Sequence, residues 1–374
     1  MKKNLSAIDI RYLVNELQQL VGARIDKIYH PSAKELLIQT YQTGKGKQLM
    51  YINAGIAAYI TQNKEAAGEE PDSFCMFLRK HLDAALVRKI EQYDAERIIA
   101  LELSKKNASY ALILEFFAKG NILLTDHLNV ILSAAEYGSW KDRSLRPKIP
   151  YTYPKRPYRL FTLGEQELKE ILSASKKESV VTSLAVDLGL GGVFAEEACI
   201  IAGINKETGP KEVAEKNASS LASALASLIN KQQIRPQIIR TEGKSIDAIP
   251  FPLSVYNGCE AEDTMTFSQA LAAHFKALLF QPKKTKQDIA LEKIDAIIAR
   301  QQESIAELKS DAANEARKAE LIFEHYAAVS DILRELRKAR ERLSWKEIAE
   351  KLKGHKTIKQ AIGKENAVVV ELGE

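Results

Sequence analysis

Apolar residues recur every three or four positions between Lys283 and Leu343, and this is the most sustained pattern in the chain. Ile298, Ile305 and Leu308 belong to a heptad stripe, while Glu, Lys and Arg fill most of the remaining positions. Neither Pro nor Gly interrupts the stretch. Such a stripe is typical of a coiled-coil helix, and at about 1.5 Å per residue it predicts a rod of about 90 Å. The alternative is a long helix lying in a core.

A hydrophobic seam of this length needs a partner, which residues 344–374 are too short to supply. Gly354 and Gly363 interrupt this tail, in which Ser344 and Glu347 predict the cap of one short helix. Two interpretations stay open. Either two copies of the chain pair as a dimer, or the chain is a fragment whose returning helix is absent, and we favour the fragment. The last run, NAVVVELGE, has strand character and nothing after it to pair with.

Residues 1–140 predict an antiparallel sheet with two helices. A helix is expected at 6–21, where Ser6 and Asp9 form a capping box, and a second one at 71–82. Alternating apolar and polar residues predict strands with one solvent-facing side. The strand sequences are ARIDKIYH, ELLIQTYQ, KQLMYINA, ALVRKIEQY, RIIALEL, YALILEFF and NILLTDHLNVILSA. Tight turns are expected at residues 44–46 and 119–121.

Residues 141–159, KDRSLRPKIPYTYPKRPYR, are basic and aromatic, and their four prolines predict no regular structure. Tyr151, Tyr153 and Tyr158 alternate with cations, a mixture that can hold phosphates and stack on bases. A solvated linker is the alternative. The candidate nucleic-acid contacts here are Arg143, Arg146, Lys148, Lys155 and Arg156. Arg79 and Lys80 are further candidates, although at the end of the second helix they would also complement its dipole.

Residues 163–230 predict helices around a glycine turn. The sequence LAVDLGLGGVFAEEACIIAGI resembles a helix-hairpin-helix, in which backbone N–H groups at the turn suit a phosphate. The candidate residues are Gly189, Gly191 and Gly192, and a purely structural turn is the alternative. Beyond them, IPFPLSVY predicts a strand and TFSQALAAHFKALLF a helix, which we expect to pack back on the first domain.

The composition and the absence of known motifs exclude several classes of function but do not identify one. The chain has 374 residues, a formal net charge of +5 and three cysteines in no metal-binding spacing, which favours a reducing cytoplasm. It shows no signal peptide and no apolar run of the roughly 18–20 residues that a membrane span needs. No catalytic motif, metal site or cofactor fingerprint is present. We therefore expect a protein that is not an enzyme and needs no cofactor.

Several stretches, taken in order, resemble the NFACT family: LSAIDIRYLVNEL, GARIDKIYHPSAKELLIQ, PDSFCMFLRKHL, AERIIALEL, LILEFFAKGNILLTD and YTYP. These ribosome quality-control factors are called NEMF in animals and RqcH in bacteria, with fibronectin-binding protein A as an older name, and the spacing is archaeal-like. The resemblance implies an α+β fold: an antiparallel-sheet N-terminal domain like that of Fpg-type glycosylases, a helix-hairpin-helix domain and a long coiled-coil helix. The implied segments are 1–162 and 233–282 (NFACT-N), 163–232 (helix-hairpin-helix), 283–343 (arm) and 344–374 (start of the middle domain).

The resemblance also implies partners and site residues. Family members bind large ribosomal subunits that hold a stalled peptidyl-tRNA, and they recruit tRNA for template-free tailing of the nascent chain, with alanine in bacteria. The implied partners are therefore the large ribosomal subunit, its rRNA and a tRNA, with alanine tRNA expected. Family function depends on an Asp in the first helix and an Asp-Arg pair in the sheet. Asp9 and Arg97 match this pattern, whereas Glu96 replaces the second Asp with a longer side chain.

Two other functions stay open. Fpg-type glycosylases use the amine of a proline that follows the initiator Met, and this chain has Lys2 there, so a glycosylase would lack its nucleophile. A non-catalytic, nucleic-acid-binding relative of those enzymes is still possible. The third candidate is a coiled-coil scaffold or adhesin, against which the missing signal peptide argues.

Overall fold

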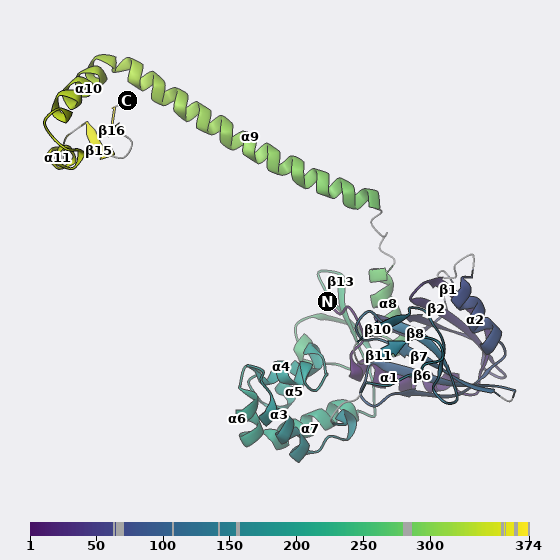
Figure 1. The fold of residues 1–374 in the computed structure, drawn as a ribbon. Coiled ribbons are helices and arrows are strands. Elements are labelled where there is room, and N and C mark those ends of the chain that lie inside the picture. Colours follow the sequence, from purple (N-terminus) through teal and green to yellow (C-terminus); the bar gives the residue numbers. More distant parts are fainter. Residues whose placement is uncertain are drawn as a thin grey trace. The chain divides into compact units, whose positions relative to one another are not determined.

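The computed structural model describes residues 1–62, 64, 71–106, 108–140, 143–154, 158–279, 286–352, 355, 357–362 and 366–372. The chain divides into two compact units, residues 1–281 and 282–374 (Figure 1). None of the helices in these described residues is long and apolar enough to cross a bilayer.

A nine-stranded antiparallel sheet dominates the first unit, with the strand order β4-β3-β2-β1-β5-β6-β7-β8-β9. Strands β1 and β5 meet at a single pair, Arg24 with Leu86, so the sheet is joined only at one end of these strands. The runs predicted from alternation all form strands, but NILLTDHLNVILSA forms two, β8 and β9, and β4 is an addition that the pattern did not show. Their bounds are β1 Arg24–Ser32, β2 Glu35–Gln42, β3 Gly46–Asn53, β4 Ala57–Thr61, β5 Leu86–Gln92, β6 Ile98–Lys105, β7 Ala108–Glu115, β8 Asn121–Asp126 and β9 Ile131–Ala134.

Helix α1, Ala7–Leu17, packs against β5 and β6 and lies close to α8. Its capping box is confirmed, since the Ser6 side chain accepts from Asp9 N and the Asp9 carboxylate accepts from Ser6 N. One face of the helix is fully buried, with Ile10, Leu13 and Leu17 in the core. The second predicted helix is also confirmed as α2, Ser73–Leu82, and packs on β1.

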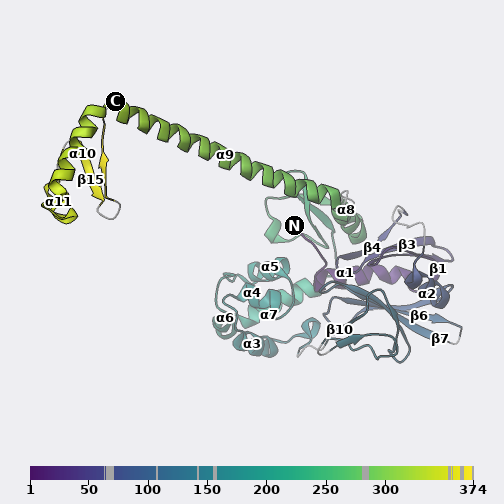
Figure 2. The same cartoon turned by 45° about the horizontal axis from the view of Figure 1, so that its top comes forward.

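Residues 163–230 are helical, as predicted, and form α3 Glu165–Ala174, α4 Val180–Val186, α5 Gly192–Ala202, α6 Pro210–Lys216 and α7 Ala218–Ile229. Figure 2 shows these helices as one cluster beside the sheet. The Tyr12 hydroxyl of α1 donates to Leu228 O and accepts from Lys231 N, which ties the end of α7 to the first helix. The helical segment is therefore fastened directly to the element that carries Asp9.

The chain then returns to the sheet-containing part. Strands β12 Gln237–Thr241, β13 Lys244–Ile249 and β14 Glu260–Asp263 form a small antiparallel sheet, and α8, Phe267–Leu279, packs on β4. The Ser268 side chain accepts from Ile60 N, so this segment packs back on the first strands as expected. The strand predicted for IPFPLSVY is wrong, because only its first residue, Ile249, belongs to a strand (β13) and the run ends in a 3-10 turn at Ser254–Tyr256.

The second unit contains α9 Lys286–Glu324, α10 Tyr326–Arg340, α11 Trp345–Lys351 and the hairpin of β15 Ile358–Ile362 with β16 Ala367–Val370. The prediction of one uninterrupted arm helix is wrong. His325, at φ −106° and ψ 26°, separates α9 from α10, which turns away from the axis of α9 in both ribbon views (Figures 1 and 2). The Ser344–Glu347 capping box is confirmed. The terminal run also has a partner, because β16 pairs with β15.

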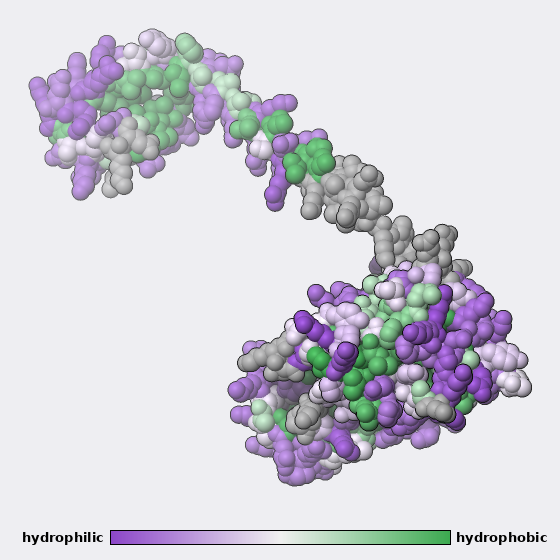
Figure 3. Space-filling model, turned by 45° about the vertical axis from the view of Figure 1, so that its right-hand side comes forward, coloured by the Kyte–Doolittle hydropathy of each residue, from purple (hydrophilic) through white to green (hydrophobic). Residues whose placement is uncertain are grey.

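Hydrophobic side chains on α9 alternate with hydrophilic ones along the helix (Figure 3). Several apolar members of the heptad stripe are about half exposed or more, namely Ile294, Ile298, Ile305 and Leu308. The stripe is therefore uncovered within this chain's own described residues. Pairing of this helix with another one stays a prediction.

Candidate functional site

A cavity of about 500 Å³ lies where the N-terminal segment meets the glycine turn of the helical segment. It brings together five residues that were singled out separately in the sequence, since Asp9, Arg97, Gly189, Gly191 and Gly192 all line it. The other lining residues are Met1, Lys2, Lys3, Asn4, Ser6, Ala185, Val186, Leu190, Val193, Phe194, Asp247 and Tyr256. Segments far apart in sequence, within residues 1–9, at Arg97, within 185–194 and within 247–256, therefore build one hollow.

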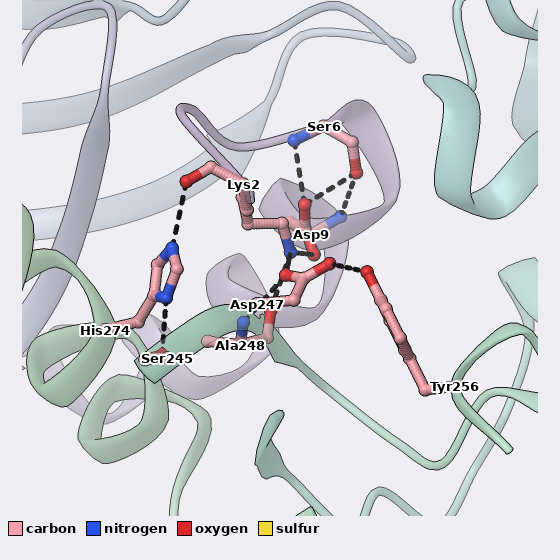
Figure 4. Close-up of polar contacts among 8 residues, drawn as sticks. All are labelled: Lys2, Ser6, Asp9, Ser245, Asp247, Ala248, Tyr256 and His274. Carbon is pink, nitrogen blue, oxygen red and sulfur yellow. Dashed lines mark hydrogen bonds and ion pairs between the residues drawn. The ribbon is translucent and has the colours of Figure 1, made fainter. Parts of the chain in front are cut away.

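Asp9 forms part of the floor of this cavity and is completely buried. Its Oδ2 accepts from Ser6 N and Ser6 Oγ, each at 2.8 Å, and its Oδ1 accepts from Lys2 Nζ at 3.0 Å (Figure 4). Burial raises the pKa of the Asp9 carboxyl, and the nearby Lys2 ammonium opposes that shift. Both carboxylate oxygens are thus occupied by the protein itself, which makes Asp9 a residue that organises the cavity floor.

Lys2 and Asp247 complete this floor, and the sequence pattern did not point to either as a site residue. Lys2 Nζ lies 2.8 Å from Asp247 Oδ1, and the Tyr256 hydroxyl donates to Asp247 Oδ2 (Figure 4). Burial alone would lower the pKa of Lys2, but the two carboxylates outweigh it and the pKa is raised. Burial, together with Asp247, raises the pKa of Tyr256. The floor therefore holds a charged lysine between two carboxyl groups.

The glycine turn forms another wall. Gly191, at φ +80°, is the N-cap of α5, and it has no side chain to cap the first N–H groups of that helix. A methyl group placed on Gly191 would lie 3.6 Å from Ser6 Cβ, so the N-terminal ends of α1 and α5 meet at this cavity. Helix N-termini carry a partial positive charge and favour anions. This wall suits a phosphate or another hydrogen-bond acceptor.

Glu96 and Arg97 lie in the turn between β5 and β6, and only Arg97 lines the cavity. The Gln92 side-chain amide fixes this turn, because it donates to Glu96 O and also to Ala7 O at the start of α1, each at 2.9 Å. Glu96 is 8% exposed and buried beside it. The turn is thereby fastened to the helix that carries Asp9, and Arg97 is the member of the pair that is placed at the hollow.

The prediction that residues 141–159 lack regular structure is wrong at Arg143–Leu145 and is confirmed for 146–154. The expectation that their tyrosines are available for stacking is wrong. Gly138–Trp140 and Arg143–Leu145 form a short hairpin, β10 with β11. Tyr151 and Tyr158 are buried, and Tyr153 stacks on Tyr93 at 3.8 Å between ring centroids. These rings are occupied in packing, because the sheet provides long-range partners that the local sequence does not reveal.

The remaining basic candidates are scattered. Arg143 forms an ion pair with the buried Glu115 and lies over the Phe117 and Tyr151 rings, so it holds the core together. Arg146 and Lys148 are exposed. Arg79 donates to Ile28 O and, together with the exposed Lys80, lines a different hollow. Lys155 and Arg156 lie outside the described residues. None of these described side chains lines the cavity at Asp9.

The described residues contain no group of three or more His, Cys, Asp or Glu side chains that is arranged to hold a metal ion. What the cavity offers is an arginine, uncapped backbone N–H groups of a helix and carboxylates held by a lysine. Such a set binds and orients a polar ligand by charge and hydrogen bonds.

Fold and site together define a mixed helix and antiparallel-sheet protein with a polar binding cavity. A family model for the NFACT N-terminal and middle domains matches residues 6–363, and the chain belongs to this family.

The relatives are proteins of ribosome quality control. The chain is 28% identical to the archaeal Rqc2 homolog aRqcH of Methanocaldococcus jannaschii over 95% of its own length and 55% of that protein. It is 25% identical to the ribosome quality control complex subunit NEMF of Homo sapiens, over 93% of this chain and 35% of that protein. The chain thus spans about half of the archaeal relative and about a third of the human one.

A solved structure supports the fold. The fibrinogen binding protein from Staphylococcus aureus superposes with a TM-score of 0.58 at 17% identity, over 71% of this chain and 97% of that one. At this identity, the likeness speaks for a shared architecture and for nothing further. The α+β prediction is confirmed at that level.

Proposed function

We propose that this chain is the tRNA- and ribosome-facing part of a ribosome quality-control factor. In this proposal it binds large ribosomal subunits that carry a stalled peptidyl-tRNA, contacts rRNA there and recruits tRNA for template-free, C-terminal alanine tailing in the cytoplasm. The observation that carries the proposal is the match of residues 6–363 to the NFACT family, whose relatives bear ribosome quality-control names.

The cavity supports a role in holding tRNA. Arg97 and the uncapped start of α5 provide a wall that attracts a phosphate or an acceptor edge of a base. A nucleotide carries both kinds of group. The carboxylates of the floor are occupied by Lys2, Ser6 and Tyr256, so they shape the cavity. We therefore assign nucleotide contact to Arg97 and to the backbone N–H groups of Gly192 and Val193 at the start of α5, with Asp9 as the residue that shapes the floor. The Gly191 N–H is already used, because it donates to Ala185 O.

No catalytic step is assigned to the chain in this proposal. The glycosylase alternative would need a free amine at position 2. The backbone nitrogen of Lys2 is a peptide N–H that donates to Ile246 O, and its side-chain ammonium is held by Asp9, Asp247 and Ala248 O. An ammonium held in this way is a poor nucleophile, because attack requires the neutral amine. A borohydride-trapping assay with abasic DNA tests the alternative, and a covalent adduct at Lys2 would revive it.

The direct test is tRNA binding by the chain and by the Arg97→Ala variant at rising salt. We expect binding that weakens steeply with salt, because phosphate contacts release counterions, and a loss of about tenfold for Arg97→Ala. The melting temperature should change little. Arg240→Ala is the matched control, since Arg240 is paired with Glu262 on β14 and is absent from the cavity lining.

Two outcomes would contradict the proposal. One is wild-type chain that fails to bind tRNA at low salt and fails to co-sediment with isolated large ribosomal subunits. The other is an equal loss for Arg97→Ala and Arg240→Ala, which would show that binding depends on overall charge and not on the cavity.

A further inference from the structure

Lys2 is held by its side chain and by its backbone. The ammonium donates to Asp9 Oδ1 at 3.0 Å and Ala248 O at 2.6 Å, and pairs with Asp247 Oδ1 at 2.8 Å (Figure 4). Three partners match the three N–H groups of a lysine, so the direction of the side chain is fixed. The backbone of Lys2 also donates to Ile246 O at 2.6 Å. The second residue of the chain is thereby fastened to strand β13.

A second set of hydrogen bonds surrounds this contact. His274 of α8 lies with Nε2 2.9 Å from Lys2 O and Nδ1 2.7 Å from Ser245 Oγ (Figure 4). Burial lowers the pKa of His274, so its neutral form is favoured, in which one ring nitrogen donates and the other accepts. The N-terminal segment is therefore held by α1, β13 and α8 together.

Lys2 supplies the buried cation that Asp9 and Asp247 share. Its side chain is 8% exposed, and those of Asp9 and Asp247 are 0% and 1% exposed. Two carboxyl groups thus share one buried ammonium. Removing one member of a buried ion pair is costly, since it leaves an uncompensated charge out of water. Loss of the Lys2 ammonium would leave the two carboxyl groups next to each other without their shared cation. Each would then turn toward other hydrogen-bond donors.

The cavity depends on the segment that Lys2 holds. Met1, Lys2, Lys3, Asn4 and Ser6 all line it, and Ser6 is also the residue that faces the Gly191 wall. If residues 1–6 moved, the distance between the N-terminal ends of α1 and α5 would change. The positions of the side chains on the cavity floor would change with it. A site that binds through charge and hydrogen bonds loses affinity when its groups are displaced.

We infer that Lys2 is a positioning residue for the tRNA-binding cavity. Its ammonium fastens residues 1–6 to β13 through Asp247 and Ala248 O, and we call this contact the clip. The same ammonium orients Asp9. This inference rests on the proposed function of the cavity. In this role Lys2 does not contact the tRNA, because its ammonium has no N–H group left for a ligand. It acts by holding the wall and the floor of the cavity in place.

Three variants separate positioning from stability. Lys2→Met should weaken tRNA binding by about tenfold or more and lower the melting temperature, because two buried carboxylates lose their cation. Lys2→Met/Asp247→Asn removes one of those charges and should recover much of the melting temperature. Its tRNA affinity should stay low, because the clip is still missing. Lys45→Met, an exposed turn lysine outside the cavity, is the matched control and should keep both values.

Hydrogen exchange of the amides of residues 2–6 supplies a readout that is independent of tRNA. We expect faster exchange in both Lys2 variants and an unchanged rate in Lys45→Met. Recovery of tRNA affinity together with melting temperature in the double variant would overturn the inference and leave Lys2 a stabilising residue only. Unchanged exchange in the Lys2 variants would also overturn it. If the wild-type chain binds no tRNA, the proposed function fails, and the exchange result alone decides whether the clip exists.

Discussion

The cavity floor of the first unit and the stripe on α9 use charged and apolar side chains in opposite ways. In the first unit, the ionisable side chains of Lys2, Asp9 and Asp247 are buried, and each has its partners within the same chain. On α9, the stripe residues Ile305 and Leu308 are 51% and 64% exposed. Polar groups that are buried need their partners built in, whereas exposed apolar groups of a heptad stripe gain from a partner that arrives later.

The two units therefore obtain their stability in different ways. The first unit is stabilised by contacts between segments that are distant in sequence, such as Lys2 with β13 and Tyr12 with the end of α7. An isolated helix draws little stability from propensity alone, and its amphipathic face usually needs packing. We therefore expect the two units to respond differently to the same substitution.

The largest effect is expected from a pair of leucines. Leu13→Ala, at a fully buried position of α1, should lower the free energy of unfolding by about 2–5 kcal/mol, because it opens a cavity in the core. Leu308→Ala, at an exposed position of α9, should change it by less than about 0.5 kcal/mol. Urea denaturation of both variants measures the difference.

An equal loss of unfolding free energy at both positions would contradict this difference between the two units. It would mean that the α9 stripe is already covered in solution, and pairing with a second copy is the simplest way to cover it. Sedimentation equilibrium then separates the cases, since a paired wild-type chain would be dimeric and Leu308→Ala would shift it toward monomer. A monomeric wild-type chain with an insensitive Leu308 would support a partner helix from elsewhere.

A smaller loss of stability is expected when two glycines are replaced by alanine. Gly120 has φ +71°, and a Cβ placed there would lie 2.1 Å from Gly55 N, so two turns of the sheet touch backbone to backbone. Gly44 has φ +85° with nothing within 4 Å of such a Cβ. Gly44→Ala should cost about 1–2 kcal/mol from its backbone conformation alone.

Gly120→Ala should cost more than this, because the clash adds to the strain and the turns must separate. The same urea denaturation compares the two variants. Equal losses would show that the two turns move apart freely, and that the first unit is less tightly closed than the close approach of Gly55 and Gly120 indicates.

Local patterns in the sequence predicted most of the fold. Alternation revealed the strands of the large sheet, and the Ser6–Asp9 and Ser344–Glu347 spacings revealed two helix starts, since caps depend on residues only three apart. The break at His325 was missed because it involves neither Gly nor Pro. The pairing of β15 with β16 was also missed, because the first strand of this hairpin is short and lies between two glycines.

The site was predictable only in part. Asp9, Arg97 and the glycine turn were found by their resemblance or local chemistry, and the fold brings them to one cavity. Lys2 near the chain start carries no local sign of burial, because its partner Asp247 is distant in sequence. Tyr151 was misjudged for the same reason, since Glu115, to which its hydroxyl donates, lies on a strand far upstream. Long-range polar partners leave no periodic trace.

The smallest effect is expected in the pH dependence of the free energy of unfolding that comes from Asp9. Burial raises the pKa of Asp9 above its ordinary value of 3.8, so the folded chain holds this proton to a higher pH than the unfolded chain does. As the pH rises from about that value, the unfolded state ionises first, and the stability contributed by the protonated form is lost. The free energy of unfolding of the wild type, relative to Asp9→Asn, should therefore fall with rising pH.

The exposed Asp263 offers a control of opposite sign. Hydrogen bonds from Gln237 and Arg235 lower the pKa of Asp263, so the stability of the wild type relative to Asp263→Asn should rise with pH in the range below its ordinary value. Urea denaturation at several pH values compares the two slopes. A rising slope for Asp9 would mean that Lys2 outweighs burial at the cavity floor, and that the floor prefers its charged form in the folded protein. The buried cluster would then behave like the surface pair, and the contrast between buried and exposed charge would disappear.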